Sequence, residues 1–325
     1  STLFPYTTLF RSSTEASTGN IVTIGAENGS NGPVNANLAE ASLYGTSYYD
    51  AGTNAEQVFA NDSDRIAGNT LNVTGTGVKA KSIRNFQKLN FKIGSLFKDQ
   101  DSMLTLSQAG GFGTVTGSAD NVRTAWSNIT ADTSQLSAER GAGIQGKNTF
   151  TLLQTVVPPS PDPLYPNDLR FSGYTETAYA DVDRVYEKKL HVNSSAVKNG
   201  ADVDANAVLL ELNRYKDGTV THDGSTSPAE VYGGYSAYDD TKEVNGQHIG
   251  HTTKNNTLSI TGIATGNNLT AYGGYTGGAM GGSENNHVIV NVQNASPGTL
   301  NAVYGGYTKG DRKSTRLNSS HSTES

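Results

Sequence analysis

Apolar and polar residues alternate in four short segments of the chain, each of which begins at an asparagine or directly follows one. The segments are Asn20–Ile24, Asn69–Val73, Asn256–Ile260 and, after Asn285 and Asn286, residues 287–292. Such alternation is typical of a half-buried strand, because successive side chains of a strand point to opposite faces. In the third segment we expect Leu258 and Ile260 on one face, with Thr257 and Ser259 on the other.

A second phrase, Tyr-Gly-Gly-Tyr, occurs three times in the last third of the chain. Its copies are Tyr232, Gly233, Gly234 and Tyr235; Tyr272, Gly273, Gly274 and Tyr275; and Tyr304, Gly305, Gly306 and Tyr307. A weaker copy begins at Tyr44. In this region the two phrases alternate, and segments rich in Gly and Asn, such as 266–268 and 277–282, separate them. Short strands and turns that recur at intervals of tens of residues predict stacked repeats.

The composition agrees with a repetitive all-β structure. Only 34% of the 325 residues are hydrophobic, and 37 are glycine. A solenoid needs few apolar residues, because each repeat contacts only its neighbours and the core is a narrow column. The 30 asparagines suit tight corners and side-chain ladders. The alternative is a disordered low-complexity linker, although the charged fraction of 17% and the net charge of −6 do not require disorder.

Three further segments stand apart from the repeats. Residues 82–106 are the most apolar part of the N-terminal half and are expected in the core. Residues 158–166 contain 5 of the 9 prolines, which predicts a loop, because proline cannot donate to a strand ladder. Between Asp181 and Leu190 the apolar spacing fits either a short helix or a pair of strands.

The two ends of the chain differ from its body. Residues 1–12 (STLFPYTTLFRS) and 311–321 (DRKSTRLNSSH) resemble conceptual translations of sequencing-adapter DNA. Without residues 1–12 and 309–325, the chain keeps 19 Lys and Arg against 28 Asp and Glu, a net charge of −9. We therefore expect an internal fragment of a longer protein; the alternative is a genuine basic tail. The expected parts are 1–12, β-helix rungs at 13–157, a Pro-rich loop at 158–168, rungs with YGGY phrases at 169–308, and 309–325.

The repeat phrases resemble those of bacterial autotransporter passengers, which are adhesin-like proteins of the outer surface. VYGGYS/T phrases alternate here with NNTLSITG-like phrases, and Ser82–Phe91 (SIRNFQKLNF) is similar to an I-x-N-F-x-x-L-x-F segment of such passengers. The resemblance implies a right-handed parallel β-helix, export and display at the cell surface. It also implies attachment to the outer membrane through a C-terminal barrel, which we expect to be missing from this fragment. The absence of cysteine suits a chain that crosses the periplasm unfolded.

Little in the sequence indicates chemistry. Without cysteine, disulfides, thiol catalysis and Cys-based zinc sites are excluded. The acidic balance argues against a nucleic-acid partner. His248 and His251 are spaced for two metal ligands, but they are expected in a loop and lack a third ligand. Acidic pairs such as Asp181 and Asp183 would lie side by side on a strand, where solvated surface acids are expected. We expect no catalytic, cofactor or metal site.

The tyrosines are the candidate functional residues. Stacked phrases would align Tyr232 and Tyr272 with Tyr304 within aromatic contact. The two tyrosines of each phrase are expected on opposite sides, one inward and one outward, unless the glycines bend the strand. We therefore expect a non-enzymatic surface passenger that mediates adhesion or self-association. Its partners would be host or bacterial surface glycans or proteins, or further copies of itself. The alternatives are a β-helical polysaccharide lyase or glycoside hydrolase, and a structural spacer.

Overall fold

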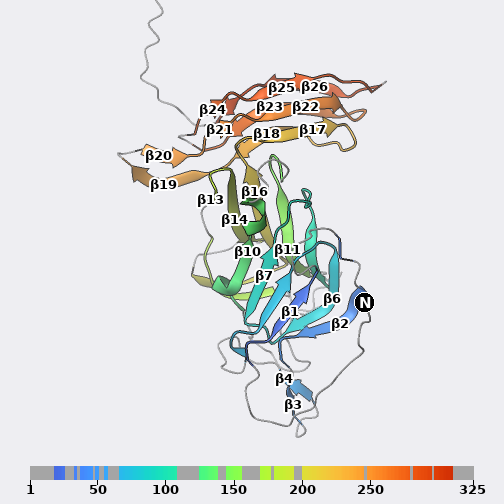
Figure 1. The fold of residues 1–325 in the computed structure, drawn as a ribbon, viewed down its shortest axis with the longest axis vertical. Coiled ribbons are helices and arrows are strands. Elements are labelled where there is room, and N and C mark those ends of the chain that lie inside the picture. Colours follow the sequence, from blue (N-terminus) through green and yellow to red (C-terminus); the bar gives the residue numbers. More distant parts are fainter. Residues whose placement is uncertain are drawn as a thin grey trace, which may run out of the picture. The chain divides into compact units, whose positions relative to one another are not determined.

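The fold is taken from a computed structural model of the chain, which is predominantly β. The structure describes residues 18–25, 33–34, 37–46, 48–50, 55–57, 66–107, 124–137, 144–155, 169–176, 179–193, 200–244, 247–278, 281–294 and 296–309. Most of these residues lie in strands, and many neighbouring strands are parallel (Figure 1). Within these ranges, no helix has both the length and the apolar character that a membrane crossing requires. The segments 1–12 and 158–168 lie outside the described residues.

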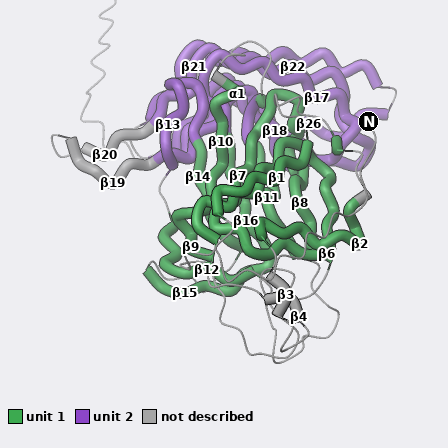
Figure 2. The backbone as a smooth tube through the Cα atoms, turned by 60° about the horizontal axis from the view of Figure 1, so that its bottom comes forward, with its two compact units in different colours: residues 1–144, 148–177, 188–212 green, residues 145–147, 178–187, 213–325 purple. Residues whose placement is uncertain are grey.

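The chain forms two compact units (Figure 2). Unit 1 comprises residues 1–144, 148–177 and 188–212, and unit 2 comprises residues 145–147, 178–187 and 213–325. One sheet of unit 1 has the order β1-β5-β7-β10, and every pair in it is parallel. Its strands are β1 (Ile21–Ile24), β5 (Thr70–Val73), β7 (Lys88–Lys92) and β10 (Ile129–Asp132). The asparagine-led segments at 20–24 and 69–73 therefore pair as strands, as predicted.

A larger, seven-stranded sheet has the order β13-β14-β16-β11-β8-β6-β2, in which β13 is Ala180–Val182. Its other strands are β2 (Asn37–Tyr44), β6 (Val78–Arg84), β8 (Ser102–Leu106), β11 (Thr149–Thr155), β14 (Tyr186–Val192) and β16 (Ala207–Arg214). The last two continue into unit 2. The pairs β2–β6, β6–β8 and β8–β11 are parallel, whereas β11–β16 is antiparallel. The prediction of parallel pairing throughout is therefore wrong for this part of the chain.

The remaining strands of unit 1 form a three-stranded and a two-stranded sheet. The first has the order β15-β12-β9, and the second is the antiparallel pair β3–β4. Their strands are β3 (Tyr48–Asp50), β4 (Ala55–Gln57), β9 (Thr124–Ala125), β12 (Leu169–Tyr174) and β15 (Ala201–Ala205). Helical segments among the described residues include a 3-10 turn at Trp126–Asn128 and α1 (Ser134–Ser137). Trp126 is buried, and its ring centroid lies 5.3 Å from that of Phe171.

The segment 82–106 is buried as the sequence predicts. Its fully or nearly fully buried side chains are Ile83, Phe86, Leu89, Phe91, Ile93, Met103, Leu104 and Leu106. Buried residues alternate with exposed or half-buried ones along β7, as the strand period requires, whereas β8 buries both Met103 and Leu104. These strands thus supply much of the core of unit 1.

Two parallel stacks of strands form the main part of unit 2. One has the order β17-β22-β25 and the other β18-β23-β26, with β27 also paired to β23. Their strands are β17 (Thr219–Asp223), β18 (Glu230–Ser236), β22 (Thr257–Gly262), β23 (Asn268–Thr276), β25 (His287–Val290), β26 (Thr299–Tyr304) and β27 (Tyr307–Thr308). Between them lies a core of Leu258, Ile260, Ile263, Leu269 and Ala271. Equivalent phrases of the sequence therefore pair with one another.

The other strands of unit 2 are short. They are β13 (Ala180–Val182), β19 (Asp239–Val244), β20 (Gln247–Gly250), β21 (Thr253–Lys254) and β24 (Ser283–Glu284). β19 and β20 form an antiparallel pair, and β21 and β24 a parallel pair. A turn with positive φ at Asp183 and Arg184 joins β13 to β14. Residues 181–190 are therefore a strand pair, not a helix.

Candidate functional site

The tyrosines of the three YGGY phrases form two columns of stacked rings. Parallel pairing sets Tyr232 opposite Tyr272 and Tyr272 opposite Tyr304. Ring centroids in this column are 5.3 Å and 5.1 Å apart, with interplanar angles of 12° and 10°. The predicted alignment is confirmed. The second column contains Tyr235, Tyr275 and Tyr307, with centroids 5.2 Å and 5.1 Å apart. We call these six residues the tyrosine ladder.

The expectation of one inward and one outward tyrosine per phrase is wrong. The two rings of each phrase meet edge to face, with centroids 4.9 Å apart for Tyr232 and Tyr235 and 5.2 Å for Tyr272 and Tyr275. Both rings of a phrase must therefore lie on the same side of the strand. Leu269 and Ala271 belong to the apolar core, so the alternation that begins with them points the Tyr272 ring away from that core, and stacking leaves this residue only 8% exposed.

The glycine pair explains why the second tyrosine is also outside. A Cβ on Gly273 would lie 2.5 Å from the carbonyl oxygen of Gly305, and one on Gly274 would lie 2.3 Å from Nδ2 of Asn286. Added Cβ atoms would also meet Val288 Cγ2 beside the core and Oγ1 of the buried Thr253, so both glycines face inward. This interrupts the alternation and returns Tyr275 to the same side as Tyr272. At Gly273 and Gly274 the neighbouring atoms come so close that a side chain larger than the hydrogen of glycine does not fit.

Gly273→Ala is expected to lower the unfolding free energy by about 1–3 kcal/mol, because the added methyl group must displace backbone of the next strand. Gly305→Ala is the matched control, since it is the same position of the last phrase and its Cβ would meet only Asn286 O at 3.7 Å. The control should change the free energy by about 0.5 kcal/mol or less. Urea unfolding followed by circular dichroism measures both, and equal losses would contradict the explanation.

Glu230 joins the first two rungs of the ladder through the phenol groups. The hydroxyl of Tyr232 donates a hydrogen bond to Oε2 of Glu230, and that of Tyr272 donates to Oε1 at 3.3 Å. Burial and the neighbouring carboxylate raise the pKa of Tyr272 to about 12. The same causes raise the pKa of Tyr232 well above its usual value. Tyr232 and Tyr272 therefore stay neutral phenols to a higher pH than a free tyrosine does.

Stability is expected to fall at alkaline pH. Because folding raises the pKa of Tyr272 from 10.0 to about 12, the folded state retains its proton more strongly. This contribution is complete below pH 10 and is lost as pH rises toward 12, with a slope of up to about 1.4 kcal/mol per pH unit for each proton. The midpoint of urea unfolding, recorded at several pH values between 10 and 12, measures this loss of stability. Tyr272→Phe should flatten the slope, and an unchanged slope would contradict the assignment.

Asparagines form a second ladder at the corner beneath the tyrosines. Asn256 is completely buried and donates through Nδ2 to Tyr215 O at 3.0 Å and to Asn286 Oδ1 at 2.8 Å. Its Oδ1 accepts a hydrogen bond from the backbone of Gly218. The preceding residue, Asn255, has a φ of 57°, which asparagine adopts more easily than most residues. The same side-chain pairing joins Asn20 to Asn69 in unit 1 at 3.0 Å.

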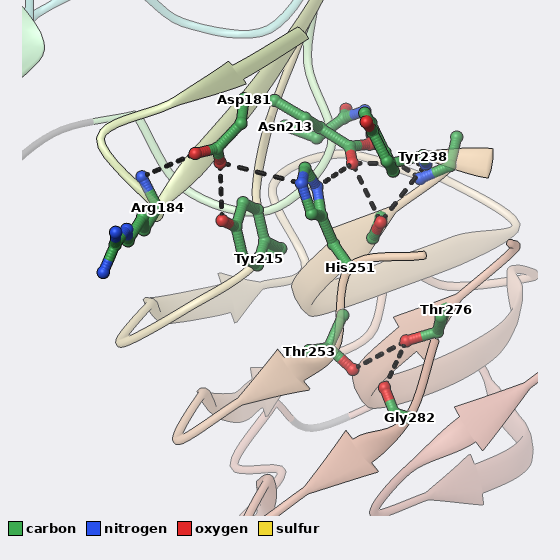
Figure 3. A network of polar contacts seen from close by, with 12 residues as sticks. Asp181, Arg184, Asn213, Tyr215, Tyr238, His251, Thr253, Thr276 and Gly282 are labelled. Atoms are coloured by element: carbon green, nitrogen blue, oxygen red, sulfur yellow. Dashed lines mark hydrogen bonds and ion pairs between the residues drawn. The ribbon is translucent and has the colours of Figure 1, made fainter. Parts of the chain in front are cut away.

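A cluster of polar residues around Glu187 and His251 was not predicted from the sequence (Figure 3). Glu187 is completely buried, and His251 Nδ1 lies 3.1 Å from its Oε2. The other donors to the Glu187 side chain are Asn213 Nδ2, Ser236 Oγ and the backbone N–H groups of Ala237 and Tyr238, at 2.6–3.2 Å. Because these groups all donate, Glu187 acts as an acceptor-only carboxylate, and Nδ1 of His251 carries the hydrogen.

The His251 ring lies stacked between two tyrosine rings. Its centroid is 4.2 Å from that of Tyr215 and 4.0 Å from that of Tyr238. Asp181 completes the cluster: its Oδ1 accepts a hydrogen bond of 2.6 Å from the hydroxyl of Tyr215 and lies 3.7 Å from His251 Nε2. Figure 3 shows Asp181 between the Tyr215 hydroxyl and the His251 ring. The cluster joins the segments around β13, β16, β18 and β20 of unit 2.

This geometry corrects two expectations. Asp181 and Asp183 do not lie side by side on a strand, since β13 ends at Val182 and Asp183 has a φ of 53°. His248 lies in strand β20, not in a loop, and His251 follows that strand. Among the residues that the structure describes, no group of three His, Asp or Glu side chains is placed to hold a metal ion. Two members of the cluster stood out in the sequence, but for other reasons: Asp181 as part of an acidic pair, and His251 as part of a possible metal-ligand pair.

The third rung leaves apolar side chains exposed. Ile289, Val290, Val303 and Tyr304 are 39–49% exposed. At the other end of the ladder, the ammonium group of Lys147 lies 4.9 Å from the ring centroid of Tyr235. The outer face of Tyr304 is therefore the most accessible ring of the ladder. Comparisons of the chain with protein-family models, curated proteins and solved structures found no match.

Proposed function

We propose that this chain is a passenger segment of an autotransporter-type surface protein, folded as a right-handed parallel β-helix that mediates adhesion or self-association. The observation that carries the proposal is the in-register parallel pairing of the YGGY strands β18, β23 and β26. Strands that repeat the same phrase stack with the same side chains in line, which is the arrangement that a rod of repeats requires. The cell surface is the proposed location.

The tyrosine ladder defines the kind of contact that such a rod would make. The faces of the rings pack against one another, so sugars cannot stack on them along the ladder. The accessible parts are ring edges and hydroxyl groups, together with the exposed ring of Tyr304. Each contact of this kind is weak. When many of them are repeated along one rod, binding at one site raises the effective concentration at the next, so the overall binding becomes stronger. The proposed partners are surface proteins, surface glycans bound through hydroxyl contacts, or further copies of the chain.

The enzyme alternative receives little support from the described residues. The cluster around Glu187 is the strongest grouping of acids with a base, but Glu187 is completely buried and accepts five hydrogen bonds. Both faces of the His251 ring are covered by tyrosines. A general acid or base must reach a substrate, and this arrangement instead fixes neighbouring segments of unit 2. We therefore propose a structural role for it.

Display on bacterial cells tests the proposal. The full chain would be fused to the membrane barrel of an autotransporter, and protease accessibility would establish display. We expect displayed cells to settle from suspension or bind epithelial cells faster than cells that carry the barrel alone. A matched control is the same fusion with Glu187→Ala, which should disrupt unit 2. A chain that is displayed and folded but produces neither effect would favour a spacer and overturn the adhesive function.

A further inference from the structure

The tyrosine ladder brings six phenol rings together in a protein that contains no cysteine. Stacked partners on neighbouring strands are 5.1–5.3 Å apart between ring centroids, and their planes are within 15° of parallel. A thiol would normally be the first group to react with an oxidant, because its thiolate is strongly nucleophilic. With cysteine absent, the tyrosines of the ladder are left as oxidisable groups: Tyr304 is 39% exposed and stacks on Tyr272, which is itself only 8% exposed.

Glu230 supplies what oxidation of a phenol needs besides an oxidant. A tyrosine loses its phenolic proton when it loses an electron, so a base in hydrogen-bond contact assists the reaction. The carboxylate of Glu230 accepts hydrogen bonds from both Tyr232 and Tyr272, whose rings are stacked 5.3 Å apart. The Glu230 side chain is exposed, so it can pass the proton on to water.

We propose that the tyrosine ladder is a site of oxidative modification, at which Tyr232 and Tyr272 are joined as dityrosine. The co-reactant is a peroxide, activated by a haem peroxidase. Each phenol loses one electron and one proton to give a phenoxyl radical, and the two radicals form a carbon–carbon bond between their ortho positions. The two ortho hydrogens then return to the ring oxygens. The two electrons and two protons released reduce one hydrogen peroxide to two waters.

The product would link two strands that are distant in sequence. Tyr232 lies in β18 and Tyr272 in β23, which pair in parallel register. A bond between them closes a loop of 39 intervening residues, and such a cross-link stabilises chiefly by restricting the unfolded chain. The dityrosine bond would thus stabilise this cysteine-free chain in the way that a disulfide stabilises a chain with cysteines. The inference rests on the strand register, the stacked rings and the Glu230 hydrogen bonds, and it stands whether or not the adhesive function is correct.

Peptide mapping after peroxidase treatment tests the proposal. The full chain at low concentration would be treated with a haem peroxidase and hydrogen peroxide, and its monomer digested with trypsin. Cleavage after Lys216, Lys242, Lys254 and Lys309 places Tyr232 and Tyr272 on separate peptides, 217–242 and 255–309. We expect a joined peptide whose mass is two hydrogens below the sum of the two.

Three variants assign the bond. Tyr232→Phe keeps the stacked ring and should lose most of the joined peptide, whereas the matched control Tyr235→Phe should retain it. Glu230→Gln keeps both rings and should slow its formation. The proposal is overturned if treated wild-type chain gives no joined peptide while free tyrosine couples. It is also overturned if Tyr232→Phe gives as much as wild type, or if chain unfolded in urea gives an equal yield.

Discussion

Glu187→Ala is expected to cost about 3–5 kcal/mol of unfolding free energy, the largest effect of any single substitution that we predict. The Glu187 side chain is completely buried and collects hydrogen bonds from a wide span of unit 2. The donors are Asn213, Ser236, Ala237, Tyr238 and His251. Alanine would leave these donors without an acceptor in a site closed to water, and each unpaired group carries its full desolvation cost.

Urea unfolding combined with hydrogen exchange of the amides of β18 measures this loss within unit 2. Glu187→Gln should also lower the unfolding free energy of unit 2. The NH2 group of glutamine would face N–H and O–H groups that now donate to a carboxylate oxygen, and donors cannot pair with one another. The matched control is Glu284→Ala, since the Glu284 side chain is 56% exposed and pairs only with Lys254. The control should change the free energy by about 0.5 kcal/mol or less. A loss for Glu187→Ala as small as that would show that the cluster does not hold unit 2 together.

Asn256→Ala is expected to cost about 2–4 kcal/mol, because it removes the central member of the asparagine ladder. The Asn256 side chain is completely buried and satisfies Tyr215 O, Gly218 N–H and Oδ1 of Asn286. Alanine cannot replace any of these bonds, and it leaves a cavity beside Gly234, whose Cα packs directly against the amide. The backbone corner between Tyr215 and Gly218 should therefore open first.

Hydrogen exchange at Gly218 distinguishes this mechanism from general destabilisation. In Asn256→Ala the Gly218 amide should exchange much faster than amides of β22, which keep their backbone partners. Asn301→Ala is the matched control, because Asn301 is exposed and makes one weak side-chain contact of 3.5 Å to Thr270. We expect native-like stability for that variant. Equal losses at the two asparagines would contradict a special role of the buried ladder.

Much of unit 2 could be predicted from sequence because its information is local and repeated. Alternation at 256–260 specifies a strand whatever surrounds it, and β22 indeed alternates between buried and half-buried residues over this segment. When the same phrase recurs, the strands that carry it are expected to pair with one another, since identical apolar faces stack best in register. The alignment of Tyr232, Tyr272 and Tyr304 followed from this argument without knowledge of any contact.

Other features were decided by tertiary structure. The antiparallel pair β11–β16 lies where the repeats are weakest, so no recurring phrase specified its partner. The side on which Tyr275 lies depends on Gly273 and Gly274, and their meaning becomes clear only when Gly305 and Asn286 are seen against them. A glycine pair in a sequence indicates freedom of the backbone, but not which way the strand uses it.

The sequence by itself determined the repeated strands of unit 2 and the partners that repetition aligns, because periodicity and phrase identity are properties of neighbouring residues. Only the tertiary structure decided the common outer face of the tyrosines and the burial of Glu187 beneath His251. Those features join residues that are 64 positions apart in the chain or depend on close approach of backbones. The free energy of such contacts comes from exclusion of water by the whole fold, which no local pattern encodes.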